Sequence, residues 1–415
     1  MPATRPDAAR HSDRVGPRHG EPRRRATAEA LVACVREHPL DQPVPELTRY
    51  VDQYGVTGIA EAARRHGVVG CLWTALRAGG LSERDDATVV REQYRGNVGR
   101  HLRTLSDLEL VDEVLGAAGT RYLVVKGPVL AEHVYRRPDL RASVDLDLVV
   151  TPRDFALALS SLEEAGCRVY EANWRLARQR MLGELRLFTP AGTVLDLHWS
   201  LFAEMDVRQA FPASVDLLLR RARTISLAGR TVRTLDELDT LVHLALHASL
   251  SGGHRLVWCK DIEQALLRGR EDGWLDWDAV VNRAEQWNAG PALALMLART
   301  GAVLGADVPE DLVGDLTPAR GWRAATRLAD RLTPVSRAGG GGSLARLVAR
   351  SVRADGRSSL RELTRRGGAW LGHGARRHSP VRNLFDPSDP ESAAYPDGGS
   401  AGRAAYLDAV CRQPG

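Results

Sequence analysis

The 415-residue chain has very little lysine. Of its 57 Lys and Arg residues, only Lys126 and Lys260 are lysines. No apolar run approaches the roughly 18 residues that a membrane-spanning helix needs. The five cysteines are scattered without a Cys-x-x-Cys pair, so neither a disulfide framework nor a zinc site has support. Residues 1–25 are rich in Arg, Pro and His and lack the apolar core of a secretory signal. We therefore expect a reduced, cytoplasmic protein without a transmembrane segment.

The net charge of +5 is unevenly distributed along the chain. Residues 1–25 carry +4 and residues 344–382 carry +8, so the rest of the chain carries −7. The body is mildly acidic and its two flanks are basic, which narrows the question of binding to RNA or a similar polyanion to the basic helix after the Gly-rich segment. A hydrophobic content of 44% excludes wholesale disorder.

Apolar periodicity divides the chain into an α/β core between helical regions. Short β-branched and alternating runs predict strands within residues 121–126, 144–150, 167–172, 184–189 and 193–201. The predicted segments are a disordered basic tail (1–26), an N-terminal helical region (27–118), the α/β core (119–230), a helical domain (231–335), a Gly-rich linker (336–343), and a basic helix with a C-terminal tail (344–415).

Acidic residues interrupt two of the predicted strands. Asp145 and Asp147 flank Leu146, so a strand places both carboxylates on one face. Two carboxylates this close repel each other unless a cation lies between them. Asp196 lies in another apolar strand and can bring a third carboxylate to the same face. Three converging oxygen ligands suit Mg²⁺ or Mn²⁺, whereas the structural alternative is a solvated strand face.

A strand, a turn and a helix surround Lys126 and Gly127. Glycine allows the backbone to approach a ligand closely, and the helix that follows presents free N–H groups to a phosphate. Lys126 adds a positive charge at the end of its strand. A phosphate cradle beside a metal-binding carboxylate cluster is typical of phosphoryl or nucleotidyl transfer.

These motifs resemble a known family. The segment YLVVKGPVLAEHVYRRPDLRASVDLDLVV, and the later VLDLHWSL, are similar to the signature of the bacterial uncharacterised nucleotidyltransferases. That family lies within the DNA polymerase β-like nucleotidyltransferase superfamily. The resemblance covers roughly residues 28 to 330 and implies an α+β fold, in which a nucleotidyltransferase core with a short mixed sheet is flanked by helical regions.

The resemblance also implies roles for individual residues. Asp145 and Asp147 would hold two metal ions, and Asp196 would complete the site that activates the incoming hydroxyl. Gly127 occupies the place of the glycine in the superfamily's Gly-Ser motif, but Pro128 follows it instead of a hydroxyl residue. Nucleotide binding is then expected from Lys126, Gly127 and Arg141, with the alternative that Arg141 pairs with a surface acid.

Several polar residues of the same region have two interpretations. His198 lies on the strand face of Asp196 and either orients it, contacts substrate or packs structurally. His243 and His247 are four residues apart on a predicted helix, and we favour core-facing or substrate-contacting roles over a metal pair. Lys260 and Asp261 are expected to start a helix, which favours a cap or surface charge for Asp261.

A second basic feature follows the Gly-rich segment. The spacing predicts one helix with six arginines on one gently drifting face, namely Arg346, Arg350, Arg353, Arg357, Arg361 and Arg365. The face is either a solvated surface or a site for RNA, an acidic peptide or a membrane surface.

The predicted function is a metal-dependent nucleotidyltransferase. It would transfer a nucleoside monophosphate from an NTP to a hydroxyl of a peptide or small-molecule acceptor and release pyrophosphate, with Mg²⁺ or Mn²⁺ as cofactor. One alternative is transfer to tRNA or another RNA, as in related toxins, for which the arginine helix is the only support. The other is a degenerate fold that binds a nucleotide without catalysis.

Overall fold

A five-stranded mixed sheet lies at the centre of the computed structural model, which describes residues 20–170, 173–316, 324, 326–328, 344–372 and 399–415. The strand order is β1-β2-β5-β4-β3; β2 and β5 are parallel, and all other neighbours are antiparallel. The strands are β1 (Tyr122–Val125), β2 (Asp145–Val150), β3 (Arg168–Val169), β4 (Glu184–Phe188) and β5 (Val194–His198). All five predicted strands are present, and the predicted α+β class is confirmed.

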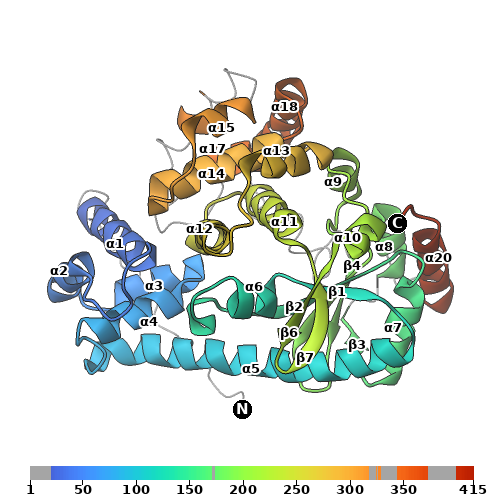
Figure 1. Ribbon diagram of the computed structural model, residues 1–415, viewed down its shortest axis with the longest axis horizontal. Coiled ribbons are helices and arrows are strands. Elements are labelled where there is room, and N and C mark those ends of the chain that lie inside the picture. The colour runs from blue at the N-terminus through green and yellow to red at the C-terminus, as the bar shows by residue number, and fades with distance from the viewer. Residues whose placement is uncertain (1–19, 171–172, 317–323, 325, 329–343, 373–398) are drawn as a thin grey trace, which may run out of the picture.

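Alternation along the strands gives the sheet two different faces. Leucines of β2, β4 and β5 point to one face, where they form a buried core with α5 (Thr88–Ala117) and α7 (Phe155–Glu164). The last helix, α20 (Gly399–Cys411), packs against α7 and α8 (Trp174–Arg180) and adds the buried Tyr406 to this core (Figure 1). The opposite face is left for polar residues and for the helical domain.

The N-terminal helices cluster at the far end of the long α5, away from the sheet (Figure 1). They are α1 (Gly20–Val35), α2 (Pro45–Tyr54), α3 (Thr57–His66) and α4 (Val69–Ala78), followed by a single turn, η1 (Asp85–Ala87). The predicted disordered tail to residue 26 is wrong in its last part, because α1 begins at Gly20. Arg23, Arg24 and Arg25 are exposed, so their charges do not oppose a helix in this segment. The Thr27 hydroxyl donates a hydrogen bond to the Arg23 carbonyl at 2.8 Å, within the first part of α1.

A β-hairpin that the sequence did not reveal links the core to the helical domain. Its strands are β6 (Arg223–Leu227) and β7 (Arg230–Thr234), so the predicted boundary at residue 230 divides the hairpin. Ala228 and Gly229 form the turn with φ values of 53° and 78°. Two positive φ values suit the twist of a two-residue hairpin, but Ala-Gly is a weak signal for it in a sequence.

Helices from both sides of this hairpin pack above the polar face of the sheet. Two short helices precede it, α9 (Met205–Ala210) and α10 (Val215–Arg221). The helical domain follows with α11 (Glu237–Leu250), α12 (Leu256–Glu271), α13 (Trp277–Gln286), α14 (Gly290–Leu304) and α15 (Glu310–Asp315). Asp236 caps α11 by accepting a hydrogen bond from the Asp239 amide at 2.6 Å. Among the described residues, no helix combines the length and apolarity required to cross a membrane.

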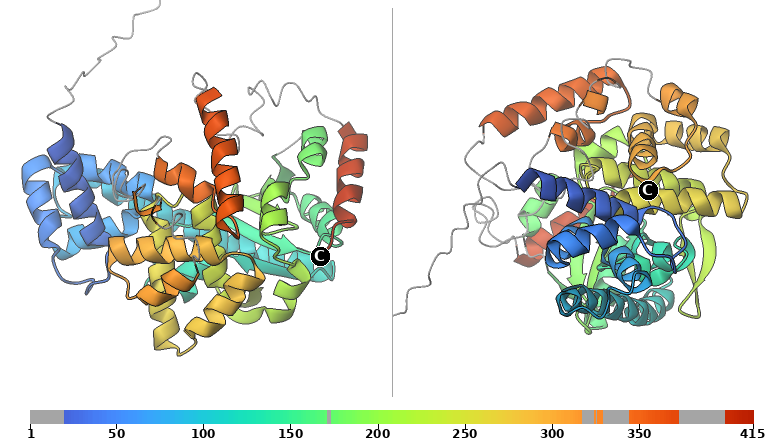
Figure 2. Two further views of the ribbon diagram at one scale, coloured as in Figure 1. Left: turned by 90° about the horizontal axis from the view of Figure 1, so that it is seen from above. Right: turned by 90° about the vertical axis from the view of Figure 1, so that its left-hand side faces the viewer.

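The predicted single basic helix is wrong. It is two helices, α17 (Leu344–Arg350) and α18 (Gly356–Gly372), and α18 extends away from the sheet (Figure 2). Asp355 accepts hydrogen bonds from the amides of Arg357 and Ser358, which starts a new helix and ends the common arginine face. Arg353 is buried and forms an ion pair with Glu362 at 3.0 Å, and Arg365 pairs with the same carboxylate at 2.6 Å. The predicted Gly-rich linker (336–343) lies outside the described residues.

Candidate active site

The three predicted carboxylates lie on one face of the sheet. In the parallel pairing of β2 with β5, Asp147 is the partner of Asp196, and on β4 Arg186 is the partner of Asp196. Residues directly opposite on neighbouring strands share a face, and Asp145 shares it because it lies two residues before Asp147. The apolar neighbours of these residues are buried on the other face, which explains why alternation identified this row.

Asp147 is the most enclosed carboxylate of the row, with 4% of its surface exposed. Lys126 Nζ lies 3.0 Å and His198 Nε2 lies 3.2 Å from its Oδ1 atom. Burial would raise the pKa of Asp147, but the charge of Lys126 and the contact with His198 hold that pKa well below its ordinary value. Burial would lower the pKa of Lys126. The negative charges of Asp147 and Asp145 outweigh this effect of burial, so the pKa of Lys126 is raised. The first lysine of the chain therefore neutralises the central carboxylate.

Asp145 lacks such a partner. Its carboxylate receives no hydrogen bond or ion pair within the described part of the chain. Burial, and then repulsion from Asp147, raise the pKa of Asp145 to about 6. The site therefore holds more negative charge than its own cations compensate.

Asp196 is held by Arg186 from the next strand. Arg186 Nε lies 2.9 Å from Oδ1, and its Nη2 donates to Oδ2 at 3.1 Å. This forked pairing fixes the plane of the carboxylate. In the described residues no group of three or more His, Cys, Asp or Glu side chains is gathered closely enough to hold a metal ion. Lys126 and Arg186 supply the positive charge in this conformation.

Glu184 is a fourth carboxylate of this face that the sequence analysis missed. It is the register partner of His198, and its Oε2 lies 3.1 Å from His198 Nδ1. Burial raises the pKa of Glu184. Burial alone would lower the pKa of His198, but Glu184 and Asp147 raise it. His198 therefore lies between Glu184 and Asp147 and does not orient Asp196. The alternation of Glu184 with Leu185 and Leu187 along β4 was the signal that could have identified Glu184.

The turn at Lys126 and Gly127 is strained and tightly packed. Lys126 has φ 54° and ψ −133°, a conformation that costs a residue with a side chain about 1–3 kcal/mol. Gly127 has φ 27°, and a Cβ atom there would lie 3.0 Å from the Asp145 carbonyl oxygen and 3.1 Å from Ser143 Oγ. Glycine thus lets the turn, which begins α6 (Gly127–His133), lie against the chain that enters β2. Ser143 is fully buried, and its hydroxyl donates to the Asp145 carbonyl at 3.4 Å.

Arg141 is held by protein partners in this structure, and its predicted role in nucleotide binding stays a prediction. It follows the turn η2 (Pro138–Leu140), and its Nε lies 2.9 Å from Asp261 Oδ1, while its Nη1 donates to the Gly127 carbonyl at 3.4 Å. The Tyr135 hydroxyl donates to the same Asp261 oxygen at 2.7 Å. The alternative that Arg141 pairs with a surface acid is wrong, because its partner Asp261 is 2% exposed. Asp261 is no cap either, since α12 begins five residues earlier at Leu256.

Comparison with known proteins supports the resemblance of these motifs. Residues 55–305 match the model of the family described as uncharacterised nucleotidyltransferase. The chain belongs to this family. Among solved structures, it is similar to an antigenic nucleotidyltransferase-like protein from Paracoccidioides brasiliensis, with 16% identity over 51% of this chain and 95% of that chain. The TM-score of 0.31 is too low to support an argument, and no curated protein matches.

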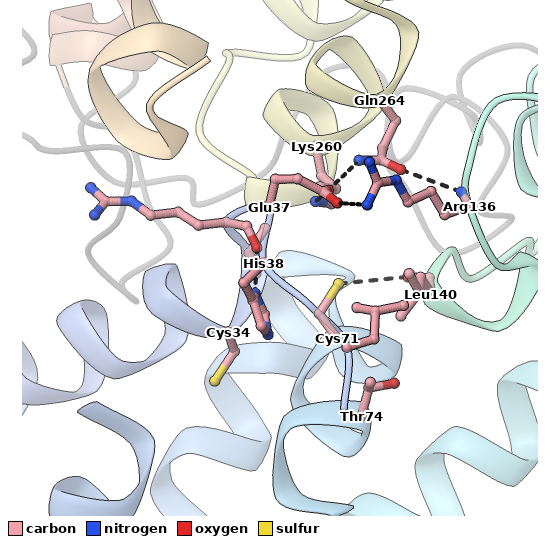
Figure 3. Close-up of a pocket in the computed structure, with 12 residues that line it drawn as sticks. Cys34, Glu37, His38, Cys71, Thr74, Arg136, Leu140, Lys260 and Gln264 are labelled. Atoms are coloured by element: carbon pink, nitrogen blue, oxygen red, sulfur yellow. Dashed lines mark hydrogen bonds and ion pairs between the residues drawn. The ribbon is translucent and has the colours of Figure 1, made fainter. Parts of the chain in front are cut away.

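The second lysine of this nucleotidyltransferase is a structural residue. Lys260 Nζ lies 2.6 Å from Glu263 Oε2 and 3.2 Å from Glu37 Oε2, and Gln264 donates to Glu37 at 2.9 Å. Figure 3 shows Lys260 and Gln264 of α12 meeting Glu37 in a pocket that Cys34 and Cys71 also line. None of the site carboxylates lines this pocket. Lys260 therefore joins the N-terminal helices to the helical domain.

Of the two histidines of α11, His243 is buried and His247 is partly buried, and both are uncharged in this nucleotidyltransferase. Burial, and then the charge of Lys126, lower the pKa of His247 to about 3 and that of His243 well below its ordinary value. Their rings meet edge to face at 6.4 Å, and His247 meets Trp258 at 6.1 Å. These contacts support the core-facing role. A contact of His247 with substrate stays a prediction.

Proposed function

We propose that this protein is a metal-dependent enzyme that transfers a nucleoside monophosphate from an NTP to a hydroxyl of a peptide or small-molecule acceptor and releases pyrophosphate. The observation that carries the proposal is the row of carboxylates. Asp145 and Asp147 share a face with Asp196, and this row borders the Lys126–Gly127 turn within a chain of the nucleotidyltransferase family. Buried acids in such a row cost stability, which indicates that they serve chemistry rather than folding.

The carboxylates fit Mg²⁺ or Mn²⁺ by their chemistry and by their charge. All three offer oxygen ligands, which these ions prefer. Asp145 has no partner among the described residues, and its raised pKa reports an uncompensated negative charge that a bound cation would offset. Asp145, Asp147 and Asp196 would hold the metal after moving closer together than they lie in the described structure. When bound, it would polarise the acceptor hydroxyl and neutralise the leaving pyrophosphate.

The remaining residues of the site have roles in binding and proton transfer. Lys126 carries its charge at the strained turn, where it can move from Asp147 to a phosphate oxygen of the NTP. Gly127 keeps that turn close to β2, and Arg141 holds the Gly127 carbonyl from below. Asp196, whose carboxylate is fixed by Arg186, would accept the proton of the acceptor hydroxyl.

Charge pairing favours a peptide or small molecule over RNA as acceptor. Arg353 and Arg365 are both paired with Glu362, and Arg186 is paired with Asp196. The six arginines that supported RNA binding lie on α17, on α18 and, for Arg353, between the two helices, and two of the six are paired with Glu362. We also propose a cytoplasmic location, supported by four buried free cysteines and the exposed free thiol of Cys411.

Binding of a metal–nucleotide complex tests the site without knowledge of the acceptor. Titration calorimetry with Mg²⁺ and the α,β-methylene analogues of the four NTPs should show binding of at least one analogue to the wild type. Asp147→Asn and Asp196→Asn should each weaken that binding at least tenfold. Asp272→Asn is the matched control, because Asp272 forms an exposed surface pair with Arg268 at 3.0 Å. Unchanged binding in both site variants would contradict the proposal.

A further inference from the structure

An aromatic pair, the exposed Tyr170 and the partly buried Phe188, extends the carboxylate row to the edge of the sheet. Tyr170 follows β3 directly and donates its amide to the Arg186 carbonyl at 2.8 Å, so it lies opposite Arg186. The Tyr170 ring meets the Phe188 ring edge to face, with centroids 5.4 Å apart. Phe188 shares a strand face with Arg186, and Arg186 contacts Asp196. The two rings therefore lie on the same face as the carboxylates.

This edge of the face is open. Tyr170 is 49% exposed and the Arg186 side chain is 45% exposed, although most aromatic residues of the described core are buried. The helices α7 and α20 cover the leucine face of the sheet, and the aromatic pair lies on the other face. A ring exposed beside a charged site is available to a ligand.

The order of the strands assigns this edge to one of the two substrates. Lys126 and Gly127 follow β1, and β1 and β3 are the two opposite edges of the sheet. In phosphoryl-group transfer the attacking and leaving oxygens lie roughly in line. If the pyrophosphate leaves toward the Lys126 turn, the acceptor approaches from the side of β4 and β3. Tyr170 lies two strand spacings, or about 10 Å, from Asp196.

We propose that Tyr170 and Phe188 form a platform that binds a planar ring of the acceptor, next to the hydroxyl that is modified. This inference rests on the proposed transferase function and adds the chemistry of the acceptor to it. Aromatic faces prefer offset or edge-to-face contact with another ring, which orients the acceptor without a fixed hydrogen-bond code. The acceptor is therefore a peptide residue or small molecule that bears an aromatic ring, with its hydroxyl directed toward Asp196.

The test measures acceptor binding separately from nucleotide binding. The probes are N-acetyl-tyrosine amide and N-acetyl-tryptophan amide, compared with N-acetyl-serine amide, N-acetyl-threonine amide and a short oligoribonucleotide with a free 3′ hydroxyl. Saturation-transfer NMR with Mg²⁺ and an α,β-methylene NTP analogue should show tighter binding of the ring-bearing amides. Tyr170→Ala should weaken that binding at least tenfold, Tyr170→Phe should retain it, and Leu157→Ala, an exposed residue of α7, is the matched control.

The outcomes separate this inference from the proposed function. Unchanged NTP-analogue binding in Tyr170→Ala, together with lost binding of the ring-bearing amides, supports the platform. Equal binding of ring-bearing and aliphatic amides, or binding of the oligoribonucleotide alone, would overturn the platform and leave the transferase function standing. Absence of NTP-analogue binding to the wild type would overturn both.

Discussion

Replacement of Lys126 by methionine tests the charge balance of the site. Lys126 Nζ lies 3.0 Å from Asp147, and Asp147 is almost fully buried. Methionine keeps the aliphatic stem but leaves Asp147 with His198 as its remaining charged contact. Removal of one partner from a buried ion pair costs about 3–5 kcal/mol. Because His198 retains its contact with Asp147 at 3.2 Å, we expect the free energy of unfolding to fall by about 3 kcal/mol, at the lower end of this range.

The effect should be independent of pH over a wide range. The pKa of Asp147 is lowered, so its contribution is lost only as the pH falls below the ordinary Asp value toward the folded pKa. The pKa of Lys126 is raised, so its contribution is lost only as the pH rises through a value above 10.5. Urea unfolding in EDTA at pH 7 therefore measures the full pair. Mg²⁺ should stabilise Lys126→Met more than the wild type, because the variant has more uncompensated negative charge.

A double-mutant cycle makes this expectation falsifiable. Lys126→Met and Asp147→Asn should be strongly non-additive, because each removes the same interaction. The other lysine of the chain is a matched control, since Lys260 forms its own buried pair with Glu263. Lys260→Met should destabilise the protein additively with Asp147→Asn. A coupling between Lys126 and Asp147 below about 0.5 kcal/mol would refute the account of the site charge.

Three further substitutions test separate features. Asp145→Asn in EDTA should stabilise the protein at pH 7 by about 2–3 kcal/mol, because the wild-type pKa of about 6 means that ionisation opposes folding as pH rises. Urea unfolding should show that this gain disappears near pH 4, and a constant gain would contradict it. Gly127→Ala should lower stability by about 1–3 kcal/mol in thermal unfolding because of its positive φ and close contacts, and unchanged stability would contradict the packing. Arg141→Lys should lower the free energy of unfolding by about 1–3 kcal/mol, since lysine lacks the planar fork with which arginine bonds both Asp261 and the Gly127 carbonyl. In a double-mutant cycle of urea unfolding, Arg141→Lys and Asp261→Asn should be non-additive, and additive effects would contradict the link between Arg141 and Asp261.

Local patterns predicted the parts of the site that lie on regular strands. The alternation of leucine with acid in residues 145–148 and 195–198 fixes which side chains share a face, and the pairing of Asp147 with Asp196 follows from parallel register. The capping residue Asp236 was likewise predictable, because its role depends on the three residues that follow it. Such features are encoded within one turn or one strand.

Contacts between distant segments were not predictable in the same way. Asp261 resembled a helix cap, and only the packing of α12 on the core shows that it binds Arg141, 120 residues earlier. Alternation with Leu185 and Leu187 marked the strand face of Glu184, but its contact with His198 became apparent only from the pairing of β4 with β5. The even spacing of the arginines suggested one helix, but Asp355 starts a second one. These errors arose because the sequence pattern does not specify which acid compensates which base.

Transfer of label from the α- or the γ-phosphate tests the central claim most directly. Wild-type protein is incubated with Mg²⁺, each NTP labelled at one position, and the amide and oligoribonucleotide probes. The account predicts that α-label enters a covalent product with release of pyrophosphate, that γ-label does not, and that Asp147→Asn abolishes the product while Asp272→Asn retains it. Transfer of γ-label, or NTP binding without any transfer of α-label, would contradict it.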